Sequence, residues 1–213
     1  MADATSVLHI SPVIPVVTID DPRHAVPVAR ALAAGGVGII ELTLRTQSAL
    51  ESLELIANEV PEILVGAGTI LTPAQAEASV SAGAQFLVSP GVTPSLLDHM
   101  LSLSIPILPG VATVGEVMAG LERGLTEMKF FPAGPAGGPR YLAAIGAPIP
   151  HVQFCPTGGI SLATAPSYLA LPNVSCIGGS WLTPRAAIEN EDWARITNLA
   201  HDTAGLRAEA TLS

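Results

Sequence analysis

Short apolar segments alternate with helix-forming segments along the whole chain, and this alternation limits the folds that the chain can adopt. Most of the apolar segments carry few polar residues on either face, as strands do when helices cover both sides of a parallel sheet. The strands predicted from them are residues 13–19, 39–43, 63–66, 86–89, 107–108, 128–131, 152–155 and 174–177.

Residues typical of helix ends lie between these strands. Asp21, Thr72 and Thr93 each precede a proline, which pairs an N-capping side chain with a residue suited to the first helical turn. Four of the predicted helices begin at these three residues and at Thr113. The others span about residues 48–58, 140–145, 163–169 and 191–207. Gly35-Gly36 and Gly83 end the first and third of them.

Eight strand–helix units predict an α/β fold, a compact (β/α)8 TIM barrel that forms one domain over residues 1–213. The chain is shorter than the roughly 250 residues usual for this barrel, so its loops should be short. A doubly wound open sheet is the competing fold. However, the G-x-G-x-x-G sequence expected after its first strand does not follow residues 13–19.

Charge and composition exclude several classes of partner. The net charge is −9 and the few cations are scattered, which argues against binding to nucleic acid or to an anionic membrane. No apolar run is long enough to span a membrane, and residues 1–5 do not resemble a signal peptide. The sequence therefore predicts a cytoplasmic protein.

Cysteine and histidine spacing predicts neither a disulfide framework nor a metal centre. Cys155 and Cys176 lie in apolar segments and are expected to be buried, reduced thiols. The histidines are isolated in the sequence, without H-x-H or H-E-x-x-H spacing. We therefore expect no metal and no cofactor.

Lys129 is the only lysine of the chain, and it stands in the apolar segment Met128-Lys129-Phe130-Phe131. All other cations are arginines, which stay protonated at physiological pH, whereas a lysine amine can lose its proton and attack a carbonyl to form an imine. Alternation along the strand places Lys129 and Phe131 on one face. The alternative is a structural lysine whose amine reaches solvent or pairs with a carboxylate.

Glu41 is a second ionisable residue within an apolar strand, between Ile40 and Leu42. If Glu41 and Lys129 both face the barrel axis, they can meet inside the barrel. A carboxyl group beside the amine can then carry protons during imine formation. The alternative is a buried ion pair that only fills the barrel.

Polar and glycine residues follow most strands, and the carboxyl ends of barrel strands share one mouth where active sites of this fold lie. Arg45 follows the second strand and offers a fork for a substrate carboxylate. Thr157-Gly158-Gly159 and Gly178-Gly179-Ser180 follow strands seven and eight. Loops at these two places commonly bind phosphate through backbone N–H groups. A tight turn is the alternative for each glycine pair.

Five segments together resemble the bacterial 2-keto-3-deoxy-6-phosphogluconate aldolase family, which includes 4-hydroxy-2-oxoglutarate aldolases. They are Glu41-Leu-Thr-Leu-Arg45-Thr46, Gly66-Ala-Gly-Thr69, Lys129-Phe-Phe-Pro-Ala133, Phe154-Cys-Pro-Thr-Gly-Gly-Ile160 and Cys176-Ile-Gly-Gly-Ser-Trp181. The resemblance covers almost the whole chain. It implies a metal-independent class I aldolase, a homotrimer of (β/α)8 barrels. The implied reaction yields pyruvate and glyceraldehyde 3-phosphate in the Entner–Doudoroff route.

The resemblance also implies roles for individual residues. Lys129 would form the Schiff base and Glu41 would transfer protons. The substrate-binding residues would be Arg45 and Thr69 for the pyruvyl carboxylate, Pro90 and Phe131 for the walls, and Thr157, Gly158, Gly159, Gly179 and Ser180 for the phosphate.

Two residues depart from the pattern of the family. Thr18 stands where some relatives carry an arginine, and Gly134 stands where many carry a glutamate. Recognition of the distal part of the substrate is therefore open. Two alternatives remain at this point: an aldolase for 4-hydroxy-2-oxoglutarate, and a phosphosugar-binding barrel without turnover.

Overall fold

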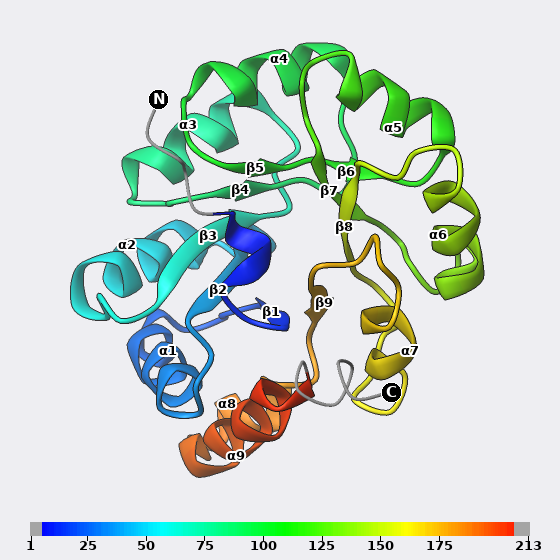
Figure 1. Ribbon diagram of the computed structural model, residues 1–213. Coiled ribbons are helices and arrows are strands. Elements are labelled where there is room, and N and C mark those ends of the chain that lie inside the picture. Colours follow the sequence, from blue (N-terminus) through cyan, green and yellow to red (C-terminus); the bar gives the residue numbers. More distant parts are fainter. Residues whose placement is uncertain (1–5, 207–213) are drawn as a thin grey trace.

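The computed structural model describes residues 6–206 as an α/β protein whose parallel strands are surrounded by helices (Figure 1). The strands are β1 (Val13–Val17), β2 (Ile39–Thr43), β3 (Leu64–Gly68), β4 (Leu87–Val88), β5 (Ile107–Leu108), β6 (Gly110–Val111), β7 (Glu127–Phe130), β8 (Gln153–Pro156) and β9 (Ile177–Gly179).

Helices connect successive strands, except β5 and β6, and lie outside the strands in Figure 1. The α-helices are α1 (Ala25–Ala34), α2 (Ala49–Glu59), α3 (Pro73–Ser81), α4 (Pro94–Ser102), α5 (Val114–Leu121), α6 (Gly138–Gly146), α7 (Ala165–Leu169), α8 (Arg185–Glu189) and α9 (Trp193–Ala204). Two 3₁₀ helices precede β1 and α1: η1 (Val7–His9) and η2 (Pro22–His24).

The strands form two parallel sheets. The first has six strands in the order β5-β4-β3-β2-β1-β9, and the second has three in the order β6-β7-β8. Together they curl so that the carboxyl ends of the strands face one side of the molecule, as Figure 1 lets the reader follow. The predicted α/β class and parallel pairing are therefore confirmed.

Two groups of buried side chains hold the fold together. The larger fills the space between strands and helices and includes Met128 and Phe130. The smaller, here called the inner cluster, lies on the concave side and consists of Val7, Leu8, Ile14, Ile39, Phe86, Val88, Leu108, Cys155 and Cys176. Helix η1 supplies Val7 and Leu8, so a segment for which we predicted no element fills part of the interior.

Capping residues begin the helices where the sequence predicts. The Thr93 hydroxyl accepts a hydrogen bond from the backbone N–H of Leu96 at 3.3 Å, and Thr72 and Thr113 each form a capping box with the residue three positions later. Asp21 caps η2 by accepting from Arg23 N at 3.0 Å, and α1 follows. These local signals positioned the helices correctly.

The structure corrects several boundaries. Strand β3 extends to Gly68, beyond the predicted end at Gly66, and Gly178 and Gly179 lie within β9, where we had placed loop residues. Strand β9 begins at Ile177 rather than at residue 174. The expected last helix is α9, which begins at Trp193, and α8 before it was not predicted; Arg207, the predicted end of the last helix, lies outside the described residues.

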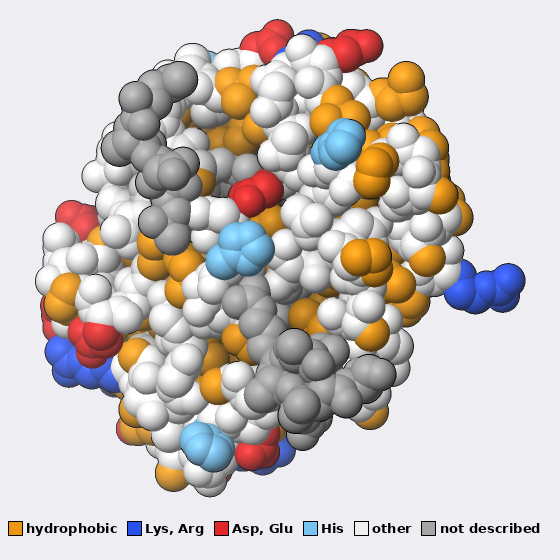
Figure 2. Space-filling view, viewed as in Figure 1, with side chains coloured by type: hydrophobic (Ala, Val, Ile, Leu, Met, Phe, Trp, Pro, Cys, Tyr) orange, Lys and Arg blue, Asp and Glu red, His pale blue; other side chains and the backbone are white. Residues whose placement is uncertain are grey.

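Positively charged side chains are scattered on the surface visible in Figure 2. On the face shown in Figure 2, Lys and Arg side chains lie near the outline of the molecule and do not gather into a patch. Within residues 6–206, none of the helices has both the length and the apolar character needed to cross a membrane.

Candidate active site

Lys129 lies on β7, in register with Gly110 of β6 on one side and Cys155 of β8 on the other. Its neighbours Met128 and Phe130 point outward into the larger core, so Lys129 points to the concave side. Only 5% of the residue is exposed. The strand thus buries an amine where alternation along the sequence predicted it.

Glu41 lies on β2 and meets Lys129 across the interior. Lys129 Nζ donates to Glu41 Oε1 at 3.0 Å and to Oε2 at 3.3 Å. Glu41 is 3% exposed, so both charges of this ion pair are buried. The register pairs Thr43 with Gly68, and a Cβ atom at residue 68 would overlap Glu41 Oε1. A glycine there makes room for the carboxylate.

This geometry can support carbonyl chemistry. Burying two charges carries a large desolvation cost, which their mutual attraction offsets only in part. Transfer of one proton from Nζ to the carboxylate would leave two neutral groups and a nucleophilic amine. The pair therefore contains a nucleophile and a proton acceptor within hydrogen-bonding distance.

Phe131 follows β7 and lies beside the amine. Lys129 Nζ is 5.5 Å from the centroid of the Phe131 ring, and Phe131 is half-buried. Gly158 lies against the Phe131 ring, since a Cβ atom on Gly158 would lie 3.2 Å from that ring. The structure thus brings Lys129, Phe131 and Gly158 together.

Pro90 is linked to Lys129 through Gly110. Gly110 pairs with Lys129 in the sheet, and a Cβ atom on Gly110 would overlap the backbone of Pro90. Thr69 directly follows β3 and has a φ of 63°, which is uncommon for a residue other than glycine. Both residues are half-buried at the carboxyl ends of their strands.

The segment that carries Arg45 is tied to the end of β1. The hydroxyls of Thr46 and Ser48 both donate to the carbonyl oxygen of Ile19, at 2.6 and 2.7 Å. Arg45 is exposed and lines a surface hollow with Asp20. Among residues 6–206, no hydrogen bond joins the Arg45 side chain to Glu41 or Lys129.

The two glycine segments predicted to hold phosphate are neighbours. Thr157 forms a parallel bridge with Gly178, and a Cβ atom at Gly178 would overlap the Thr157 hydroxyl. Gly158 and Gly159 have φ values of 101° and 76°, which favour glycine. Within the described part of the chain, the N–H groups of Gly158, Gly159 and Ser180 donate to no backbone acceptor.

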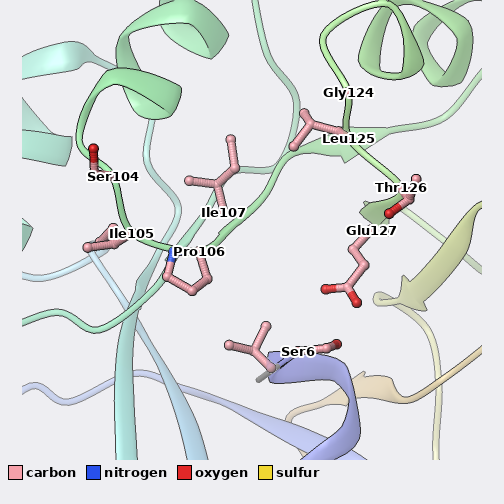
Figure 3. Close-up of a pocket in the computed structure, with 10 residues that line it drawn as sticks. Ser6, Ser104, Ile105, Pro106, Ile107, Gly124, Leu125, Thr126 and Glu127 are labelled. Carbon is pink, nitrogen blue, oxygen red and sulfur yellow. The ribbon is translucent and has the colours of Figure 1, made fainter. Parts of the chain in front are cut away.

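A separate hollow of about 410 Å³ lies at the opposite, amino ends of the strands. It is lined by residues 104–107 before and within β5, by residues 124–127 at the start of β7, and by Ser6 and Val7. Figure 3 shows the Glu127 carboxylate pointing into it toward Ser6. Because Lys129 and Glu41 do not line this hollow, it is distinct from the candidate site.

Two features of the site were not predicted. The hydroxyls of Thr18 and Thr43 form a hydrogen bond of 2.9 Å beside the ion pair. Glycine is required at residues 68 and 110 because a Cβ atom would overlap neighbouring atoms, not because the chain turns there. Strand register decides both features.

In the part of the chain that the structure describes, no group of three or more His, Cys, Asp or Glu side chains is arranged to hold a metal ion.

Known proteins are similar to this chain in sequence and in fold. A family model described as KDPG and KHG aldolase matches residues 4–199. A 2-dehydro-3-deoxy-phosphogluconate aldolase of Dickeya dadantii is 51% identical over 199 residues, and a KHG/KDPG aldolase of Escherichia coli is 52% identical over 199 residues. In both comparisons 93% of each chain is covered.

A solved structure shows the same similarity in three dimensions. It is a KDPG aldolase of Legionella pneumophila with pyruvate captured at low pH as a covalent carbinolamine intermediate. The two structures superpose with a TM-score of 0.91 at 49% identity, over 92% of the present chain and 96% of the other. The chain belongs to the KDPG and KHG aldolase family.

Proposed function

We propose that this aldolase cleaves 2-keto-3-deoxy-6-phosphogluconate to pyruvate and glyceraldehyde 3-phosphate through an imine on Lys129. The observation that carries the proposal is the buried contact of 3.0 Å between Lys129 Nζ and Glu41 Oε1. The name of the Dickeya relative supports the phosphorylated substrate. Family membership makes a phosphosugar-binding barrel without turnover an inferior account.

The reaction begins when the neutral Lys129 amine attacks the C2 ketone of the substrate. Glu41, through a water molecule, relays protons as the carbinolamine loses water and becomes a protonated imine. A base then removes the proton of the C4 hydroxyl, the C3–C4 bond breaks, and its electrons enter the imine to form an enamine. The aldehyde departs. Protonation of the enamine and hydrolysis of the imine release pyruvate and restore the amine.

The residues around the ion pair would hold the two halves of the substrate. Arg45 and Thr69 would bind the pyruvyl carboxylate, and Pro90 and Phe131 would form the walls. Because Arg45 is exposed beside Asp20, its side chain has to turn toward the substrate for this role. The phosphate would lie against Thr157, Gly158, Gly159, Gly179 and Ser180. Among the described residues, the N–H groups of Gly158, Gly159 and Ser180 donate to no backbone acceptor, which supports anion binding.

Intact mass after borohydride treatment in the presence of pyruvate tests this proposal. Wild-type protein should gain one reduced pyruvyl adduct, and peptide mapping should locate it at Lys129, since the chain has no other lysine. Lys129→Arg should lose that adduct. An adduct of Lys129→Arg anywhere except the terminal amine would contradict the imine mechanism.

The same imine chemistry on 4-hydroxy-2-oxoglutarate is the second candidate, because the Escherichia coli relative is named KHG/KDPG aldolase. Its distal carboxylate would replace the phosphorylated tail. The ratio of kcat/KM for the two substrates decides between them. A ratio in favour of 4-hydroxy-2-oxoglutarate would reverse our assignment.

We propose further that the two sheets belong to one closed (β/α)8 barrel and that residues 1–213 form one domain. Contacts across the sheet edges support closure. Lys129 N donates to Pro109 O at 3.0 Å, between the residues of β5 and β6, and the bridge of Thr157 to Gly178 joins the opposite edges. A crystal structure with an open edge at either place would contradict the closed barrel.

We also propose a homotrimer that acts in the cytoplasm. Large apolar side chains on the surface support self-association: Leu71 is 56% exposed and Met118 is 53% exposed. A charged phosphate ester does not cross membranes unaided, which supports an intracellular place of action. Light scattering after size exclusion should give three times the chain mass, and a monomer at micromolar concentration would contradict the trimer.

A further inference from the structure

Two threonine hydroxyls meet at the carboxyl ends of β1 and β2. Thr18 follows β1, Thr43 ends β2, and their Oγ1 atoms are 2.9 Å apart. The register pairs Val16 with Glu41 and Val17 with Leu42, so Thr18 lies beside Thr43. Thr43 follows Glu41 by two residues and shares its face. The hydroxyl pair therefore lies next to the ion pair along the strands, toward their carboxyl ends.

Hydrogen-bond donors decide how this pair is oriented. Thr43 Oγ1 donates to the carbonyl oxygen of Val17 at 3.0 Å, in a buried position. A hydroxyl carries one proton, so Thr43 has none left for Thr18. Thr18 must therefore donate its own proton to Thr43. The free lone pairs of Thr18 can accept a hydrogen bond, but its hydroxyl has no proton to offer a ligand.

The Glu41 carboxylate brings the reacting amine near this pair. A Cβ atom at Gly68 would overlap Glu41 Oε1, and Gly68 is in register with Thr43. The carboxylate thus extends from its own residue to the level of Thr43. Because Lys129 Nζ lies 3.0 Å from that carboxylate, a substrate joined to Lys129 passes close to the threonine pair. Thr18 is half-buried and Thr43 is fully buried, so Thr18 is the member nearer to solvent.

We infer that Thr18 is a specificity-determining residue that accepts a hydrogen bond from the C5 hydroxyl of the substrate. This inference rests on the proposed aldolase function. The C4 hydroxyl is unsuitable because its oxygen loses a proton and gains negative charge when the C3–C4 bond breaks, and an acceptor would then repel it. The C5 hydroxyl keeps its proton throughout the reaction and can donate in the ground state and in the transition state.

The inference separates the two candidate substrates. 2-Keto-3-deoxy-6-phosphogluconate has a hydroxyl on C5, whereas C5 of 4-hydroxy-2-oxoglutarate is a carboxylate that only accepts hydrogen bonds. The C5 carboxylate would then face the Thr18 oxygen, which can also only accept. This contact is unfavourable because each group loses water without gaining a hydrogen-bond partner. Thr18 therefore favours polyhydroxylated, phosphorylated substrates over short dicarboxylates.

The test runs the reaction in the condensation direction, with pyruvate and one of two aldehydes. Glyceraldehyde 3-phosphate supplies the future C5 hydroxyl, and 3-oxopropyl phosphate lacks it. Thr18→Val removes the hydroxyl at nearly constant volume, and Thr18→Ser retains it. Thr126→Val is the matched control, because Thr126 is exposed and lines the hollow at the opposite ends of the strands.

We expect Thr18→Val to lower kcat/KM for glyceraldehyde 3-phosphate about tenfold, the usual effect of one neutral hydrogen bond. For 3-oxopropyl phosphate the loss should be less than about twofold, and so should the loss in proton exchange of the pyruvate methyl group. Thr18→Ser should retain most of the preference for the hydroxylated aldehyde. Equal losses for both aldehydes, or no loss, would overturn the inference.

Two further results keep the test decisive. If Thr18→Val fails to fold by circular dichroism, the wild-type enzyme still has to prefer the hydroxylated aldehyde, and equal kcat/KM for both would overturn the inference. If wild-type protein forms no pyruvate adduct and no condensation product, the proposed function fails and the inference fails with it. A normal adduct together with an unaffected Thr18→Val variant counts against Thr18 alone.

Discussion

Lys129 Nζ contacts both carboxylate oxygens of Glu41, at 3.0 and 3.3 Å, although the two residues are 88 positions apart in the sequence. Both side chains are almost fully buried. Removal of one partner would leave the other charge buried without its counter-ion, which is costly in a protein interior. Substitutions at this pair must therefore be read by activity and by folding together.

Glu41→Gln keeps the size of the side chain and removes its capacity to take up a proton. We expect kcat to fall by about 10²–10⁴ while the fold is retained, because general acid–base transfer contributes about that factor. Steady-state kinetics and circular dichroism check both points. Near-normal turnover would show that the Glu41 carboxylate is structural. The control is Glu54→Gln, because Glu54 lies on the exposed face of α2.

Gly68→Ala places a methyl group where Glu41 Oε1 lies. The carboxylate must move, and the alignment of the amine with its proton acceptor should be lost. We expect kcat to fall on the order of a hundredfold, since small displacements at a reacting centre have effects of that size. Gly115→Ala is the control, because a Cβ atom there meets nothing within 4 Å. Equal, small effects of both variants would contradict this account.

Ser180→Asp puts a negative charge beside the segment proposed to hold phosphate. Repulsion should lower kcat/KM for 2-keto-3-deoxy-6-phosphogluconate more than the rate of methyl proton exchange in pyruvate, which leaves the distal part of the site empty. Parallel measurement of the two rates checks this. Should both rates fall together, Ser180 supports the imine pocket instead. If neither changes, the phosphate binds elsewhere.

Treatment with a chelator should leave activity unchanged. An imine acts as the electron sink that a metal aldolase obtains from a Lewis acid, so the proposed mechanism has no step for a divalent ion. The assay compares kcat before and after dialysis against the chelator. Activity that disappears and returns with one divalent ion would reject the imine mechanism.

Local signals in the sequence predicted much of the fold. The strand at residues 39–43 was predicted with the bounds found for β2, and the Thr–Pro pairs located the starts of α3 and α4. These features depend on neighbouring residues alone: alternation of faces, a capping hydroxyl, and a proline without an N–H group. The opposite faces of Lys129 and Met128 were predicted for the same reason.

Features that depend on contacts between distant segments were not predicted. The strand predicted at residues 107–108 is β5, whereas β6 was not predicted, because it exists through the pairing of Gly110 with Lys129 on β7. The bond between Thr18 and Thr43 depends on the register of β1 with β2. Arg45 was predicted from residue type alone, and its place beside Asp20 follows from hydrogen bonds of its loop to Ile19.

Helix η1 limits the directions from which reactants can approach Lys129. Val7 and Leu8 are buried in the inner cluster, together with Leu108 and Cys155, the latter in register with Lys129. The interior is filled on that side, so ligands reach the amine from the carboxyl ends of the strands. For the proposed reaction, one opening imposes a sequence of departures. The aldehyde half, farther from the amine and nearer that opening, must leave before the pyruvyl group can follow it.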